Sequence, residues 1–123
     1  LYPWPSPAEI SRYYPDQYWY VPEQDPSGHW AERYRRFVLG DHVRFVWRAI
    51  QECGEPGPVL DVGCGGGLFL RMIAERGRPV VGLDFALAAA ARAWDVNGVP
   101  AVCGSLGQPP LREQSCAVVT MFH

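Results

Sequence analysis

The sequence predicts an α/β fold, a parallel β-sheet with helices on both faces. A helical segment rich in aromatic residues precedes it in the chain. From residue 56 onward, short runs of strand-forming residues alternate with helical stretches, which implies right-handed crossovers between parallel strands. A glycine-rich loop joins the first of these runs to the first helix. Twelve of the sixteen aromatic residues, in contrast, lie in residues 1–50. We therefore divide the chain into a helical segment, residues 1–53, and an α/β unit, residues 54–123.

The composition is that of an ordinary globular chain, with 48% apolar and 20% charged residues. The net charge of −2 gives no electrostatic reason to expect binding to nucleic acid or to an anionic membrane. No apolar run reaches the roughly 18 residues that a membrane-spanning helix needs. The N-terminus also lacks the basic and apolar regions of a signal peptide. We therefore expect a cytoplasmic protein without a membrane or nucleic-acid partner.

The four cysteines stand singly, without a Cys-x-x-Cys pair or a histidine at metal-ligand spacing. We expect Cys53, Cys64, Cys103 and Cys116 to be small buried residues in a reducing compartment, and a zinc site or a disulfide framework is the alternative. All eleven cationic side chains are arginine, and alanine, glycine and proline are abundant. This pattern is typical of a GC-rich bacterial coding bias.

Two helices are expected before the α/β unit. The sequence Ser-Pro-Ala-Glu at residues 6–9 has the form of a capping box, which predicts a helix over residues 7–14 that Pro15 ends. The periodicity of residues 29–53 predicts a second helix, with Gly40 as a point where it divides into two. Its apolar side is expected to carry Tyr34, Val38, Phe45 and Ala49. If it is continuous, one face carries Arg33, Arg36, Arg44 and Arg48, as a solvated face or as a contact for an anionic acceptor or acidic partner.

The α/β unit is expected to contain four strands and two long helices. The strands are expected at residues 59–62, 79–83, 101–103 and 117–122, and the helices at residues 68–75 and 86–96.

The glycine-rich loop is the most informative feature of the α/β unit. It places Gly63, Gly65 and Gly67 between the first strand and its helix. Glycine lets the backbone turn sharply and lets a ligand approach the main chain, and the following helix points its dipole at that ligand. Because several nucleotide-binding families use such a loop, it does not identify the ligand by itself.

Two acidic residues and one leucine narrow the choice of ligand. Leu68 occupies the place of the third glycine in the dinucleotide-binding fingerprint, which disfavours a dinucleotide ligand. No Gly-Lys-Ser/Thr occurs anywhere, so the Walker pattern of nucleotide-phosphate binding is also absent. Asp61, two residues before the first glycine, would repel a pyrophosphate but suits a cationic ligand. Asp84 ends the second strand, where a carboxylate either accepts ribose hydroxyls or caps the next helix. Phe85 would cover a purine ring or belong to the core.

Residues 59–68 and 80–84 resemble the first two motifs of class I, Rossmann-like methyltransferases that depend on S-adenosylmethionine (SAM). Residues 106–123 resemble the segment that leads into and along the fourth strand of this family. The N-terminal sequence Pro-Ser-Pro-Ala-Glu-Ile-Ser-Arg-Tyr-Tyr-Pro-Asp-Gln-Tyr-Trp, residues 5–19, is similar to the leader of bacterial methyltransferases associated with polysaccharide or cell-surface glycan synthesis.

The resemblance implies SAM as the cofactor and S-adenosylhomocysteine (SAH) as its product. Asp61, Gly63 and Gly65 would hold the methionine part, and Asp84 the ribose. Ser105 and Leu106 lie where the family places its adenine contacts, but Ser105 brings a hydroxyl where a carboxylate is expected. The implied cofactor-binding residues are Asp61, Gly63, Cys64, Gly65, Gly67, Asp84, Phe85, Ser105 and Leu106.

The resemblance also suggests where the methyl acceptor binds. His123 follows the fourth strand at the carboxyl edge of the sheet, where ligands of such folds bind, so it is the candidate catalytic base or acceptor contact. The alternative for His123 is a partly buried hydrogen-bonding group. An aromatic group in the N-terminal segment would either close over the cofactor as a lid or pack that segment onto the sheet. This group consists of Tyr13, Tyr14, Tyr18, Trp19 and Tyr20.

We therefore expect a methyltransferase that acts on a small-molecule or glycan acceptor. A non-catalytic SAM-binding or assembly domain is the alternative, and an NAD-dependent enzyme is disfavoured by Leu68 and Asp61. The family fold has seven strands and only four are expected here, so the chain corresponds to its N-terminal half. The fourth strand would then be a sheet edge through which two copies pair as a homodimer.

Overall fold

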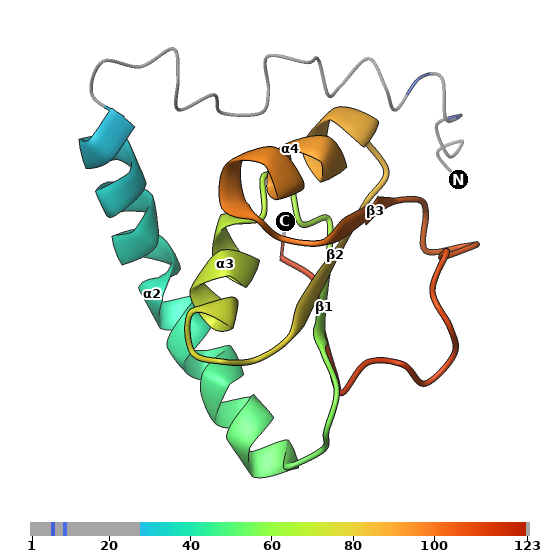
Figure 1. Ribbon diagram of the computed structural model, residues 1–123, viewed down its shortest axis with the longest axis horizontal. Coiled ribbons are helices and arrows are strands. Elements are labelled where there is room, and N and C mark those ends of the chain that lie inside the picture. Colours follow the sequence, from blue (N-terminus) through green and yellow to red (C-terminus); the bar gives the residue numbers. More distant parts are fainter. Residues whose placement is uncertain (1–5, 7–8, 10–27, 123) are drawn as a thin grey trace, which may run out of the picture.

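The computed structural model describes Ser6, Glu9 and residues 28–122 of the chain (Figure 1). The strand–helix alternation expected for the α/β unit is confirmed, although the fourth strand is shorter than expected. The elements are α2 (Gly28–Cys53), β1 (Val59–Val62), α3 (Leu68–Ala74), β2 (Val80–Asp84), α4 (Leu87–Asn97), β3 (Ala101–Cys103) and β4 (Val118–Thr120).

The four strands form one parallel sheet in the order β3-β2-β1-β4. The chain runs outward from β1 to β3 and then returns to the other side of β1, so the strand order reverses next to β1. In open α/β sheets, ligands bind at such a reversal, outside the carboxyl ends of the strands. Register pairs Asp61 of β1 with Thr120 of β4 and with Gly82 of β2. The loop after β1 therefore lies at the edge where a ligand is expected.

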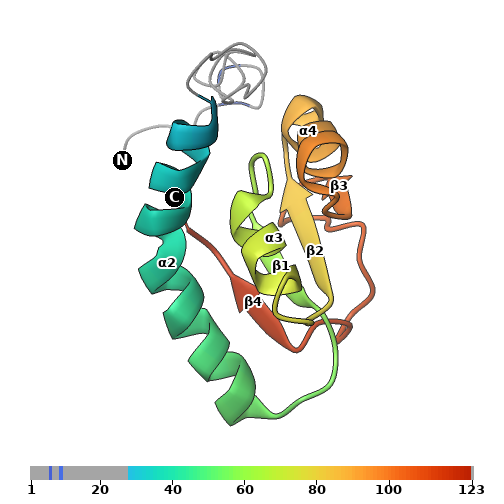
Figure 2. The same cartoon turned by 60° about the vertical axis from the view of Figure 1, so that its left-hand side comes forward.

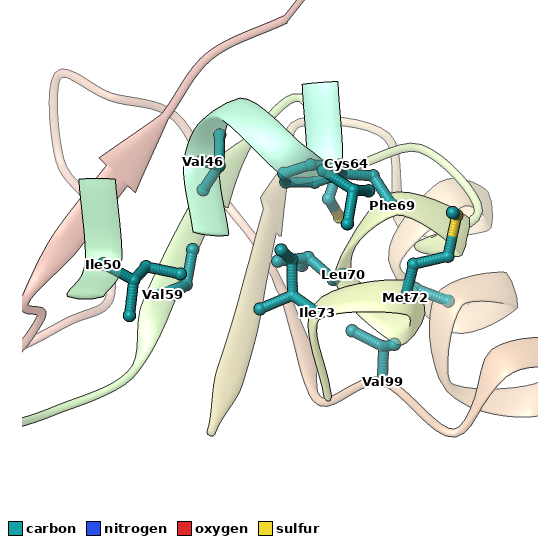
Figure 3. Packing of buried hydrophobic residues seen from close by; sticks show 11 residues of the cluster. Val46, Ile50, Val59, Cys64, Phe69, Leu70, Met72, Ile73 and Val99 are labelled. Carbon is teal, nitrogen blue, oxygen red and sulfur yellow. The ribbon is translucent and has the colours of Figure 1, made fainter. Parts of the chain in front are cut away.

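The described helices form a single layer on one face of the sheet. Helix α3 contacts both α2 and α4, and these helices share one apolar core with the sheet (Figures 2 and 3). The other face carries Leu60, Leu83 and Val119, which line a hollow beside the long loop after β3. Of the two helical layers that the fold class implies, the described residues thus supply one. The core is built from Val43, Val46, Ile50, Val59, Cys64, Phe69, Leu70, Met72, Ile73, Ala93 and Val99.

Helix α2 corrects two expectations. It runs without a break through Gly40, so the division into two helices is wrong. A glycine inside a helix costs only about 1 kcal/mol, which the burial of the α2 core residues outweighs. The expected apolar side is also wrong, because Tyr34 and Phe45 are 70% and 72% exposed. The inward side instead carries Val43, Val46 and Ile50, since these positions face α3 and β1.

One half of the expected capping box is visible in the two N-terminal residues that the structure describes, since Glu9 accepts the Ser6 N–H but the Glu9 N–H donates to the Ser6 carbonyl and not to its hydroxyl. The Ser6 N–H donates to Glu9 Oε2 at 2.8 Å, and the Ser6 hydroxyl donates to the same oxygen at 2.6 Å. These bonds lower the pKa of Glu9. The rest of the helix expected over residues 7–14, and the aromatic group of residues 13–20, lie outside the described residues.

The α2 helix shares its core with the α/β unit although it belongs to the expected N-terminal segment. The boundary between residues 53 and 54 stays a prediction. All four cysteines are free thiols, but only Cys64 is buried. The expected burial is wrong for the other three, because Cys53 ends α2, Cys103 ends β3 and Cys116 lies in the loop before β4. Within residues 28–122, no helix is both long and apolar enough to span a membrane. The same part of the chain has no group of three His, Cys, Asp or Glu side chains that could hold a metal ion.

Candidate functional site

The glycine-rich loop wraps around the carboxyl end of β2. The Gly63 and Cys64 N–H groups both donate to the Leu83 carbonyl, at 2.7 and 3.3 Å. Gly63, Gly65 and Gly67 have φ values of 75°, 53° and 78°, in the left-handed region that glycine adopts without strain. The three glycines therefore set the path of the loop, whatever the loop binds.

Gly67 also provides close packing. A Cβ atom at this position would lie 3.0 Å from the Ala93 Cβ and 3.3 Å from the Val99 Cβ. Gly82 in β2 has a similar role that the sequence did not reveal, since a Cβ there would lie 2.5 Å from Cys64 Sγ. A glycine inside a strand was the available signal. Because these two positions have no side chain, the loop packs closely against α4 and the sheet.

Cys64 is a packing residue of the loop. Its side chain is 8% exposed and belongs to the apolar core (Figure 3). Burial, followed by the nearby negative charges of Asp84 and Asp61, raises the pKa of the Cys64 thiol to about 12. The thiol therefore stays protonated and unreactive at neutral pH.

Asp61 is a buried carboxylate at the end of β1, with 5% of its surface exposed. The Thr120 hydroxyl donates to Asp61 Oδ1 at 2.7 Å. Burial raises the pKa of Asp61 to about 6, the Thr120 hydrogen bond opposes this shift, and the charge of Asp84 adds to it. Thr120 was not recognised from the sequence, because its approach to Asp61 depends on β4 pairing beside β1. The result is a carboxyl group that titrates close to neutral pH.

Asp84 organises the loop and the start of α4. It is 2% exposed. Its Oδ2 accepts the Gly65 N–H and its Oδ1 accepts the Ala86 N–H, each at 2.9 Å. Ala86, not Asp84, is the N-cap residue of α4, and no side chain caps that helix, so the helix-cap alternative is wrong; Asp84 instead holds the turn before α4 by accepting the Ala86 N–H. Each carboxylate oxygen keeps a second lone pair, and the ribose contact stays a prediction.

A cavity of about 540 Å³ lies between α2, the glycine-rich loop and α4. Four of the expected cofactor residues line it, namely Asp61, Gly63, Cys64 and Gly67. Helix α2 contributes Arg35, Val38 and Leu39. None of the three was expected at the cofactor site, because α2 approaches the loop only in three dimensions.

The other expected site residues lie apart from this cavity. Gly65 joins Asp84 through its N–H group. Phe85 is 45% exposed, Ser105 is exposed, and Leu106 lines the hollow on the opposite face of the sheet. The structure thus brings two of the three expected methionine contacts, Asp61 and Gly63, to the cavity but does not gather the expected adenine contacts around it.

The end of β4 reaches the cavity through Phe122. Its ring packs edge-on against Phe69 and His42, with ring centroids 5.1 and 5.0 Å apart, and Phe122 also lines the cavity. His123, the expected catalytic base, lies outside the described residues. Its role stays a prediction.

Three of the four arginines expected on one face of α2 form contacts within the chain, and the fourth, Arg48, is exposed. Arg36 pairs with Glu75 of α3, Arg44 pairs with Asp41, and Arg33 lies over the Trp30 ring at 5.4 Å. Arg36 therefore joins α2 to α3, and an anionic acceptor is not needed to explain it.

A parallel α/β sheet with a glycine-rich loop after β1 and an acidic residue at the end of β2 defines a Rossmann-like domain of the class I methyltransferase type. A sequence profile described as "Methyltransferase domain" matches residues 60–123, which is just over half of the chain. The chain therefore belongs to the methyltransferase domain family. A search of curated proteins finds no sequence that matches it.

Three solved structures, two of them of methyltransferases by name, share this fold. SAM-bound CalS10, an amino pentose methyltransferase from Micromonospora echinaspora, is 29% identical with a TM-score of 0.60, over 76% of this chain and 41% of that chain. Streptomyces venezuelae DesVI is 20% identical with a TM-score of 0.57, over 76% and 42%. The plantazolicin methyltransferase BpumL, solved with SAH, is 19% identical with a TM-score of 0.55, over 81% and 43%. The chain thus spans less than half the length of these proteins.

Proposed function

We propose that this chain forms the cofactor-binding half of a SAM-dependent methyltransferase that acts on a small-molecule or glycan acceptor. Membership of the methyltransferase domain family supports the activity. The acceptor class is supported by the 29% identity to CalS10, which acts on an amino pentose. The observation that carries the proposal is the buried Asp61 carboxylate at the wall of a cavity formed by the glycine-rich loop.

The residues present fit a cationic adenosyl cofactor. Asp61 and Asp84 place two buried carboxylates next to the loop, and the charge of each disfavours a second anion. A pyrophosphate would meet this negative charge, whereas the amino group of SAM would neutralise it. The ionised form of Asp61 would pair with that amino group, and Gly63 and Gly65 leave space beside the backbone.

When bound, SAM supplies an electrophilic methyl group on a sulfonium centre. The chain's own contribution is to bind and orient, because methyl transfer is an in-line displacement that depends on alignment. Val38, Leu39 and Phe122 give the cavity an apolar wall that excludes water. His123 is the candidate base for a hydroxyl acceptor.

Isothermal titration of SAH into the chain tests the cofactor assignment. We expect saturable binding, and at least about tenfold weaker binding in Asp61→Asn, because this change keeps the shape and removes the charge. Asp84→Ala should abolish binding, in part because it removes the carboxylate that accepts the Gly65 N–H. Asp95→Asn, an exposed carboxylate on α4, is the matched control and should leave the affinity unchanged. Equal affinity in wild type and Asp61→Asn would contradict the proposal.

Two further measurements separate the alternatives. Transfer of a radiolabelled methyl group to sugars or small hydroxylated acceptors distinguishes an enzyme from a non-catalytic SAM-binding or assembly domain. Titration with NADH tests the nicotinamide alternative, for which we expect no binding. Saturable NADH binding without SAH binding would overturn the cofactor assignment.

A further inference from the structure

A continuous chain of polar contacts begins between α2 and α3. Arg36 of α2 pairs with Glu75 of α3 and lies 3.7 Å from Glu32 on its own helix. Arg71 of α3 lies 3.3 Å from Glu75 and 4.0 Å from Glu32. The guanidinium of Arg71 is therefore held between acidic side chains of two helices.

The same arginine continues the chain to the glycine-rich loop. Arg71 Nη1 donates to Asn97 Oδ1 at 3.2 Å, and Asn97 Nδ2 donates to the Gly66 carbonyl at 2.6 Å. Asn97 is the last residue of α4, and Gly98 ends the helix in the left-handed conformation with φ 63°. The amide thus ties the end of α4 to the middle of the loop. Asn97 and Gly66 both line the cavity.

The chemistry of the two partners explains why an amide stands between them. The guanidinium of Arg71 is only a donor, and the carbonyl of Gly66 is only an acceptor. A side chain that bridges them must accept at one end and donate at the other, as the asparagine amide does. Because Arg71 engages Oδ1, the NH₂ group is turned toward Gly66. An aspartate would face the carbonyl with a second acceptor, and a leucine would remove the donor to the Gly66 carbonyl.

We infer that Asn97 is a positioning residue for the cofactor loop, held in orientation by Arg71. Three successive loop residues are then tied to different elements: Gly65 to Asp84, Gly66 to Asn97, and Gly67 to α4 by close packing. A loop fixed in this way needs little ordering when a ligand binds, which strengthens binding without any contact to the ligand. The ligand part of this inference rests on the proposed function, but the ordering of the loop does not.

The test compares Asn97→Asp with wild type by two readouts. We expect SAH binding to weaken by at least about fivefold, the change that corresponds to losing one hydrogen bond. We also expect faster amide hydrogen exchange at Gly65 and Gly67 in the ligand-free chain, with the strand amides of Val81 and Leu83 unchanged. Asp95→Asn on the same helix is the control and should change neither readout. Arg71→Met removes the partner of Asn97 Oδ1, and with it one positive charge, but leaves the amide itself in place, so it should produce a smaller effect of the same kind.

The outcomes separate this inference from the proposed function. If wild type binds SAH and Asn97→Asp binds it equally with unchanged loop exchange, the inference is overturned and the proposed function stands. If wild type does not bind SAH, the proposed function fails, and faster exchange confined to the loop still supports the positioning role. If Asn97→Asp and Arg71→Met speed exchange equally throughout the sheet, Asn97 is merely structural and the inference is overturned.

Discussion

The hydroxyl of Thr120 lies 2.7 Å from Asp61 Oδ1 and 3.3 Å from the Leu60 carbonyl. A hydroxyl has one proton and can also accept. When Asp61 is ionised, Thr120 donates to it. When Asp61 is protonated, the carboxyl group donates to Thr120, and Thr120 donates to Leu60. The two strands thus provide a partner for both protonation states of a buried carboxyl group.

Ligand binding should depend on pH through Asp61. Burial raises its pKa to about 6, and a ligand with a cationic amino group prefers the ionised form. The affinity for SAH should therefore increase about tenfold between about pH 5 and about pH 7 and level off above it. Isothermal titration of SAH across this pH range measures how the affinity depends on pH. Asp61→Asn should bind weakly with a flat profile, and a wild-type affinity independent of pH would argue against an ionised Asp61 at the ligand.

Asp61 should also lower the stability of the chain at neutral pH. Its pKa rises from 3.8 to about 6 on folding, so the folded state holds more protons than the unfolded state between these values. The free energy of unfolding should fall by about 3 kcal/mol as the pH rises through this window. Urea denaturation of wild type and Asp61→Asn at about pH 4 and about pH 8 isolates this contribution. The variant should gain stability relative to wild type only at the higher pH, and a constant difference would contradict the raised pKa.

The packing role of Gly67 predicts a larger penalty than backbone strain alone. Gly67→Ala places a Cβ 3.0 Å from Ala93 at φ 78°, whereas Gly77→Ala has φ 85° but nothing within 4 Å. Gly77→Ala should cost about 1 kcal/mol for the left-handed conformation, and Gly67→Ala about 3 kcal/mol because overpacking adds to it. Thermal or urea unfolding of both variants checks the difference. Equal losses of stability in Gly67→Ala and Gly77→Ala would show that α4 shifts to make room for the added Cβ at no cost in free energy.

We propose that two copies of the chain pair through β4. This strand is an edge of the sheet that the described residues form, and Val119 and Met121 are 59% and 61% exposed. Unpaired edge strands with apolar side chains bind other strands, and a charged side chain on the edge prevents this. Light scattering should therefore give a dimer for wild type and a monomer for Val119→Lys. A wild-type monomer at high concentration would contradict the pairing.

Local features of the sequence predicted much of the fold. The alternation of strands and helices, the glycine-rich loop after β1 and the acidic residues Asp61 and Asp84 all follow from short-range patterns. These patterns are reliable because turn chemistry and strand preference act over a few neighbouring residues. The capping contact between Ser6 and Glu9 belongs to the same class, since both residues lie within one helical turn.

The remaining features depend on contacts between distant segments, and only the tertiary structure decided them. The buried residues Val43, Val46 and Ile50 of α2 recur at helical spacing, but apolar residues also lie on the other side of the helix, so only packing against α3 decides which side is buried. Thr120 meets Asp61 from 59 residues away because β4 pairs beside β1. Asn97 meets Gly66 from 31 residues away because α4 packs against the loop. The sequence by itself determined which residues form the glycine-rich loop and its acidic neighbours. The packing of separate elements decided which distant residues contact the loop and these carboxylates, because no local preference encodes a long-range contact.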